Sequence, residues 1–287
     1  MTTPRLRLSL VLFISCGTLL HAGRVQPSQE ISDGIFHLKP QRPVEVLRAE
    51  ALQAIPPVEA GPFRSPDLVE VVKLDPTIKL DIRYATNQNF LGTPMYSQAR
   101  AFLQRPAAEA LIRANQKLHA EGYGVVIHDA YRPWYVTKMF WDATPDDKKI
   151  FVADPATGSK HNRGCAVDLS IYDLKTGREV SMPSIYDEMT PRSFPEYPGG
   201  TAEERQHRAT LRGAMESEGF TIYPNEWWHY DYKDWKEYPI MNVRFEDVGG
   251  GQGGARASKT QRAVQYPSEP LVAVSAQPSL SGLQSRA

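Results

Sequence analysis

Residues 159–173 read SKHNRGCAVDLSIYD, and this stretch decides how the middle of the chain folds. Residues 166–171 alternate in the two-residue period of a β-strand, so Asp168 points to one face while the aliphatic residues on either side of it point to the core. His161 precedes Gly164, on a turn that can fold back toward the strand. A loop histidine and a strand aspartate can therefore meet, and both are good zinc ligands.

Further strands are predicted around this segment from the same alternation. They are DLVEVVKL (67–74), IKLDIRYAT (78–86), YGVVIHDAYRP (123–133), which runs out into a turn, and EWWHYDY (226–232).

Two segments have the start and stop signals of helices. Pro106 suits a first helical turn and Gly122 a helix end, while Thr201 and Glu204 form a capping box for a helix through about Glu218. Helices and strands are interleaved and some turns are short. This pattern predicts an α+β fold, a mostly antiparallel sheet with helices packed against it, in a single domain over residues 67–246.

The ends of the chain differ from its middle. Residues 1–23 combine Arg5 and Arg7 with a short apolar run and the small pair Ala22-Gly23, which predicts a secretory signal that is short for a membrane span. Residues 24–66 are rich in proline and predict an extended leader with little regular structure. Residues 247–287 are rich in Gly, Ser, Gln and Pro and predict a disordered tail.

Export and charge limit the partners of the chain. A signal peptide places the mature protein outside the cytoplasm, which means the periplasm if the source is a double-membrane bacterium, and the residues before Cys16 fit a lipid-anchor site poorly. Once Cys16 is removed only Cys165 remains, so no intrachain disulfide can form. Lys and Arg total 33, as do Asp and Glu, so no basic field exists for nucleic acid or a membrane surface. We therefore expect a small-molecule partner.

A third zinc ligand has to come from elsewhere in the chain. His229, in the strand EWWHYDY, is the best candidate among the remaining histidines. Three protein ligands with one open position are typical of a catalytic zinc, whereas closed structural sites are usually rich in cysteine. The sequence therefore predicts one catalytic zinc ion per chain, although His161 and Asp168 could also form a plain hydrogen-bonded pair.

Two further residues could complete a hydrolytic site. Glu226 lies three residues before His229, so a turn after Pro224 or a β-bulge must aim both side chains to one side. Its carboxylate could then take a proton from a zinc-activated water and return it to the leaving amine. Arg132, at the end of its strand, could donate to the oxyanion. Alternatively, Glu226 is a rim charge and Arg132 half of a surface salt bridge.

The motifs S-x-H-x-x-G-x-A-x-D at residues 159–168 and EWWH at residues 226–229 resemble those of the zinc D-Ala-D-Ala peptidases. Within that group the chain most resembles the VanX-type D-alanyl-D-alanine dipeptidases, through DIRYATNQNFLG, DAYRP, AVDLSIYDLKTG and GFTIYPNEWWHYDY, from roughly residue 80 to 232.

The resemblance implies a role for each matching residue. It makes His161, Asp168 and His229 the zinc ligands, Glu226 the general base and acid, and Arg132 the group that stabilises the tetrahedral intermediate. It also implies that the substrate's free amine is bound by Asp129, Ser159 and Asp187, and that Tyr84 forms a wall of the pocket. Asp129 and Asp187 could instead be solvated turn residues.

The resemblance also frames the alternatives. Relatives of this type are often cytoplasmic, so an export signal favours a role in cell-wall turnover or recycling over antibiotic resistance. A D-Ala-D-Ala carboxypeptidase acting on peptidoglycan stems would need an open groove, whereas residues 181–200 are long enough to form a lid. A zinc-bearing cell-wall-binding module would lack the base or the arginine, and both Glu226 and Arg132 are present.

Overall fold

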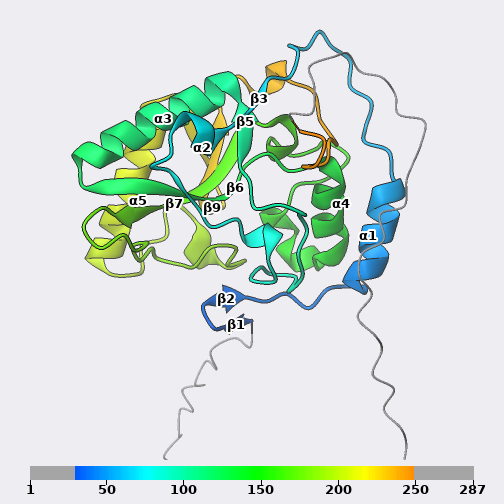
Figure 1. Cartoon of the computed structure of the whole chain (residues 1–287). Helices are drawn as coiled ribbons and strands as arrows, with labels where there is room; N and C mark the ends of the chain where they lie inside the picture. The colour runs from blue at the N-terminus through cyan, green and yellow to red at the C-terminus, as the bar shows by residue number, and fades with distance from the viewer. Residues whose placement is uncertain (1–29, 249–287) are drawn as a thin grey trace, which may run out of the picture. The chain divides into compact units, whose positions relative to one another are not determined.

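The structure is a computed structural model and describes residues 30–248 (Figure 1). These residues belong to one compact unit. The predicted signal peptide, with Cys16, and all but the first two residues of the predicted tail lie outside the described residues. Within residues 30–248, no helix combines the length and the apolar character needed to cross a bilayer.

A five-stranded sheet forms the centre of the fold. Its strands run in the order β4 (Lys79–Leu80), β6 (Tyr123–Asp129), β7 (Ala166–Asp173), β9 (Glu226–Tyr232) and β8 (Phe220–Tyr223). β4 pairs with β6 in parallel, and the other three pairings are antiparallel. β7 is the middle strand, and both of its faces are buried. The predicted α+β class with a mostly antiparallel sheet is confirmed.

The two predicted helices are present with the expected ends. α3 (Arg105–Ala120) has Pro106 in its first turn and is followed by Gly122 in a left-handed conformation (φ +90°). α5 (Ala202–Glu216) begins with the capping box of Thr201 and Glu204. α3 packs against both β6 and α5, so the two helices cover the sheet together.

Two longer helices were also not predicted. α4 (Trp134–Ala143) begins directly after Pro133, and α1 (Val44–Gln53) lies inside the segment predicted to have little regular structure. A short hairpin of β1 (Ile31–Ser32) and β2 (Ile35–Phe36) precedes α1. Figure 1 shows α1 beside α4, which it contacts. The prediction for residues 24–66 is therefore wrong for this part, because packing of α1 on α4 outweighs its weak periodicity.

Two predicted strands are much shorter than expected. Residues 67–74 form β3 (Leu68–Glu70), which pairs with β5 (Phe102–Gln104), and then one helical turn, α2 (Val71–Leu74). Residues 78–86 form only β4 and the 3₁₀ turn η1 (Arg83–Ala85). The chain turns here and buries Tyr84, which is 2 % exposed. The other 3₁₀ turns are η2 (Asp146–Phe151), η3 (His161–Arg163), η4 (Pro191–Ser193) and η5 (Trp235–Glu237).

Candidate active site

Two of the predicted metal ligands stand opposite each other in the sheet. Asp168 on β7 pairs directly with His229 on β9. His161 comes from η3, and Gly164 ends that turn with φ +67°. A Cβ atom at Gly164 would lie 2.5 Å from Cδ2 of Leu68, so both the conformation and the space favour glycine here. The turn returns the chain to β7 and places His161 beside the other two residues.

Three ligand atoms converge at this point. Nε2 of His161 lies 3.1 Å from Nδ1 of His229 and 3.2 Å from Oδ1 of Asp168, and the last two atoms are 3.0 Å apart. All three residues are buried. This set of two imidazole nitrogens and one carboxylate oxygen fits a metal ion such as zinc.

The opposite nitrogens of both rings are also held. Nδ1 of His161 lies 2.6 Å from the carbonyl oxygen of Ala130, and Nε2 of His229 lies 2.8 Å from Oδ1 of Asp231. When these nitrogens carry the protons, the facing nitrogens present their lone pairs to the metal. Sequence reasoning missed Asp231, although its position two residues after His229, on the same face of β9, was a usable signal.

Glu226 reaches the same point from the start of β9. It pairs with Tyr223 after the tight turn, where the register between β8 and β9 shifts. Its Oε2 lies 3.6 Å from Nδ1 of His229, so the turn and the irregular register bring both side chains to one side. Burial raises the pKa of Glu226 to about 8. A carboxyl group with such a pKa can both accept and return a proton near neutral pH.

Arg132 is also buried beside the three ligand residues and is 8 % exposed. Its Nε and Nη2 lie 2.9 Å and 2.8 Å from Oδ2 of Asp129, and Nη2 lies 3.6 Å from Oδ2 of Asp168. Asp129 also accepts a hydrogen bond of 2.7 Å from the Tyr96 hydroxyl. The three ligand residues line a cavity, and its lining includes Arg132 but not Asp129. The contacts of Asp129 hold the arginine, and its expected amine-binding role stays a prediction.

Asp187 is a second buried carboxyl group at the site. Its Oδ1 accepts a hydrogen bond of 2.9 Å from the Tyr84 hydroxyl, while Oδ2 has no hydrogen-bond partner within residues 30–248. Its backbone is left-handed, with φ +61°. Burial and the charge of Asp168 raise the pKa of Asp187 to about 7. An unpartnered carboxylate oxygen at a cavity wall suits an ammonium group.

Ser159 also lines the cavity. Its Oγ accepts a hydrogen bond of 3.2 Å from the backbone N–H of His161, which leaves the second lone pair of the oxygen to accept a hydrogen bond from an ammonium group. The structure thus brings together all nine of the predicted residues, with Asp129 behind Arg132 instead of at the cavity surface.

The cavity itself is small, with a volume of about 320 Å³, near the lower limit for ligand pockets. Its walls combine polar groups with aromatic rings from Tyr84, Phe90, Phe140, Trp141, Phe151, Tyr223 and Trp228. Asp187 and Met189 supply part of the lining from the segment predicted to form a lid. Tyr186 from this segment was also missed, and its hydroxyl donates to Oδ2 of Asp168 at 3.0 Å.

Three converging metal-ligating groups, a buried carboxyl group of raised pKa and an arginine define a site for metal-assisted hydrolysis. The family model described as D-Ala-D-Ala dipeptidase (Peptidase_M15) matches residues 64–248. The chain belongs to this family of peptidases.

Similar curated proteins support this membership. The D-alanyl-D-alanine dipeptidase of Escherichia coli is 33 % identical over 179 residues, which cover 62 % of this chain and 91 % of that protein. The dipeptidases of Enterococcus faecium and Enterococcus faecalis are 36 % and 37 % identical, over 56 % and 58 % of this chain and 89 % and 92 % of theirs.

Solved structures show a fainter likeness. The vancomycin-resistance D,D-pentapeptidase VanY is 18 % identical with a TM-score of 0.30, over 47 % of this chain and 75 % of VanY. The LD-carboxypeptidase LdcB is 20 % identical with a TM-score of 0.35, over 76 % of this chain and 92 % of LdcB.

Proposed function

We propose that this chain is an exported, zinc-dependent D-alanyl-D-alanine dipeptidase that acts in cell-wall turnover or recycling. The convergence of His161, Asp168 and His229 within 3.2 Å of one another, with Glu226 beside them, carries the proposal. The names of the relatives support the substrate. Residues 1–23 support export.

A zinc ion at these ligands would polarise the scissile carbonyl and lower the pKa of the attacking water. Glu226 lies where it can accept the proton of that water, because its Oε2 is 3.6 Å from Nδ1 of His229. Its raised pKa of about 8 also allows it to give the proton to the leaving amine. One residue therefore serves as base and then as acid.

Arg132 donates to the oxygen that becomes negatively charged when the carbonyl is attacked. Its guanidinium is fixed by Asp129 through two contacts to one oxygen and lies over the ring of Phe140, 4.9 Å from its centre. A donor held in this way needs little reorganisation during the reaction, which is the condition for strong electrostatic stabilisation.

The ends of the substrate are distinguished by the cavity walls. Asp187 and the Ser159 hydroxyl lie where they can pair with a free ammonium, and Tyr84 orients the Asp187 carboxyl group through its hydrogen bond. A volume of about 320 Å³ favours a short peptide over a peptidoglycan stem. These features favour a dipeptidase over a carboxypeptidase.

Amine release tests the proposal. Zinc-loaded protein would be given D-Ala-D-Ala, L-Ala-L-Ala and N-acetyl-D-Ala-D-Ala, each with and without a chelator. Chelator-sensitive cleavage of the free D,D-dipeptide alone supports a dipeptidase. Cleavage of the blocked peptide would instead assign the chain to the carboxypeptidases, and zinc binding without any cleavage would favour a binding module.

A substitution at Glu226 tests the mechanism. We expect Glu226→Gln to lower turnover by about 100-fold to 10,000-fold while zinc remains bound at one equivalent in the catalytic site. Glu196→Gln, at a side chain that is 83 % exposed, is a matched control and should keep full activity. Full turnover in the Glu226 variant would show that another group is the base.

A further inference from the structure

A second cluster of metal-ligating side chains lies on the sheet outside the catalytic site. It consists of Asp81, His128 and Glu179, whose ligand atoms all lie within 4.8 Å of one another. His128 is on β6, at the point where its register with β7 shifts between residues 127 and 129. Asp81 follows β4 and bonds through its backbone N–H to the carbonyl of Ile127. The sheet itself therefore brings these two residues together.

His128 gives an independent indication of a ligand. Its side chain is fully buried, and its Nε2 has no hydrogen-bond partner within residues 30–248. This atom lies 3.3 Å from Oε1 of Glu179, an ion-pair contact when the ring is protonated, and Nδ1 lies 3.7 Å from Oδ2 of Asp81. A buried polar atom without a partner carries a free-energy cost. Coordination of a cation by Nε2 would remove that cost.

Charge at the cluster favours a cation. Asp81 and Glu179 supply two carboxylates, and Arg83 neutralises one of them through a contact of 2.6 Å from Nε to Oδ2 of Asp81. The second oxygen of Asp81 and the carboxylate of Glu179 remain for a metal. Both side chains keep partial exposure, 40 % for Asp81 and 36 % for Glu179, so they can move toward an ion.

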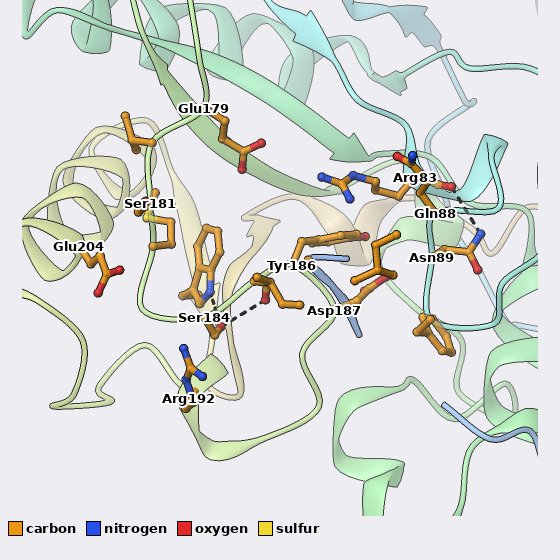
Figure 2. Close-up of a pocket in the computed structure, with 17 residues that line it drawn as sticks. Arg83, Gln88, Asn89, Glu179, Ser181, Ser184, Tyr186, Asp187, Arg192 and Glu204 are labelled. Carbon is orange, nitrogen blue, oxygen red and sulfur yellow. Dashed lines mark hydrogen bonds between the residues drawn. The ribbon is translucent and has the colours of Figure 1, made fainter. Parts of the chain in front are cut away.

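An entry path exists beside the cluster. A cavity of about 430 Å³ is lined by Glu179, Arg83, Tyr186 and Asp187 among others. Figure 2 shows Glu179 and Arg83 extending into this region from opposite sides, with Tyr186 between them and Asp187. A hydrated ion can reach Glu179 through this cavity and lose its water stepwise.

We propose that Asp81, His128 and Glu179 form a second divalent-cation site, distinct from the catalytic one. One imidazole nitrogen with two carboxylate oxygens suits Zn²⁺, Co²⁺, Mn²⁺ or Ni²⁺, whereas Ca²⁺ and Mg²⁺ prefer ligands that are all oxygen. The ring of Tyr186 lies against His128, with centroids 4.7 Å apart, and its hydroxyl donates to Asp168. Tyr186 therefore contacts a residue of each site.

Cobalt titration of the metal-free full-length protein tests the site, with bound Co²⁺ counted by equilibrium dialysis and followed by visible absorption. Wild-type protein should bind two equivalents. Glu179→Gln should bind one and still hydrolyse dipeptide, which also shows that the variant is folded. His229→Gln should bind one equivalent and lose hydrolysis, because it removes a ligand of the other site.

The controls separate this inference from the proposed function. Glu203→Gln, at an exposed glutamate of α5, should keep two equivalents. One equivalent in the wild-type protein, or two in the Glu179 variant, would overturn the second site and leave the catalytic assignment intact. Loss of the remaining equivalent in a His128→Asn, His229→Gln double variant would complete the assignment, and its retention would contradict it.

Discussion

Arg132 and Asp129 form a buried ion pair in which two nitrogens of the guanidinium share one carboxylate oxygen, at 2.9 Å and 2.8 Å. The pair lies between the catalytic ligands and the Tyr96 hydroxyl. It gives Asp129 a role in positioning the arginine, whereas the family resemblance implies a role in binding the substrate amine. The two roles differ in their kinetic effects.

Asp129→Asn is therefore expected to lower kcat and to leave KM for the dipeptide nearly unchanged. Arg132→Lys should also leave KM nearly unchanged and should lower kcat by about 100-fold to 1,000-fold, because it removes a fixed donor to the oxyanion. Steady-state kinetics with both variants is the measurement. A large rise in KM with normal kcat for Asp129→Asn would restore the amine-binding role. Arg132→Ala is less informative, since it leaves Asp129 as a buried charge without its partner.

The pKa of Asp187 predicts how substrate affinity changes with pH. Burial and the charge of Asp168 raise this pKa to about 7, so the carboxyl group is neutral below that pH and negative above it. Only the negative form pairs with an ammonium. KM for D-Ala-D-Ala should therefore fall as the pH rises through about 7, and Asp187→Asn should remove this change and raise KM by roughly tenfold or more. An unchanged profile in the variant would exclude Asp187 as the amine partner.

Asp231 is predicted to strengthen zinc binding through His229. Its Oδ1 lies 2.8 Å from Nε2 of the ring and fixes the tautomer whose Nδ1 faces the metal. We expect Asp231→Ala to weaken zinc binding by about 10-fold to 100-fold and Asp231→Asn by less. Competition with a chelator of known affinity measures the change directly. Asp234→Asn, at a nearby residue paired with Arg64, should bind zinc like the wild type.

Glu70 makes stability depend on pH far from the catalytic site. Arg100 contacts both of its carboxylate oxygens, at 2.8 Å and 2.7 Å, and with Lys73 lowers the pKa of Glu70 to about 2. A lowered pKa means that the stabilisation is complete above the unfolded-state pKa of about 4.5 and is lost as the pH falls toward 2. Arg100 is partly exposed, so we expect the ionised Glu70 to contribute about 1–2 kcal/mol to the free energy of unfolding at neutral pH.

Urea unfolding near pH 3 and pH 7 measures that contribution. Glu70→Gln should reduce the stability at pH 7 and have a smaller effect, roughly half or less, at about pH 3. Equal losses at both pH values would show that the stabilisation does not come from ionisation of Glu70.

The residues that converge at the candidate site were easier to predict from the sequence than the structure around them. His161, Asp168 and His229 could be found because each is a strong ligand type in a short local pattern, and the structure places them together. The contact between Asp129 and Arg132 could not be predicted, because it depends on Arg132 folding back across a turn. α1 was missed since its helical state depends on packing against α4, which lies about 90 residues further along the chain.

The pairing of Asp168 with His229 across β7 and β9 has a consequence for handling the protein. Backbone hydrogen bonds of a central sheet hold two of the three ligand residues in place. The conformational entropy of these residues is therefore lost when the chain folds and not when a metal ion binds. Unlike a zinc finger, which is unfolded without its ion, this site is preorganised. We therefore expect that a metal ion can be removed and replaced without unfolding, so that different metals can be compared in the same fold.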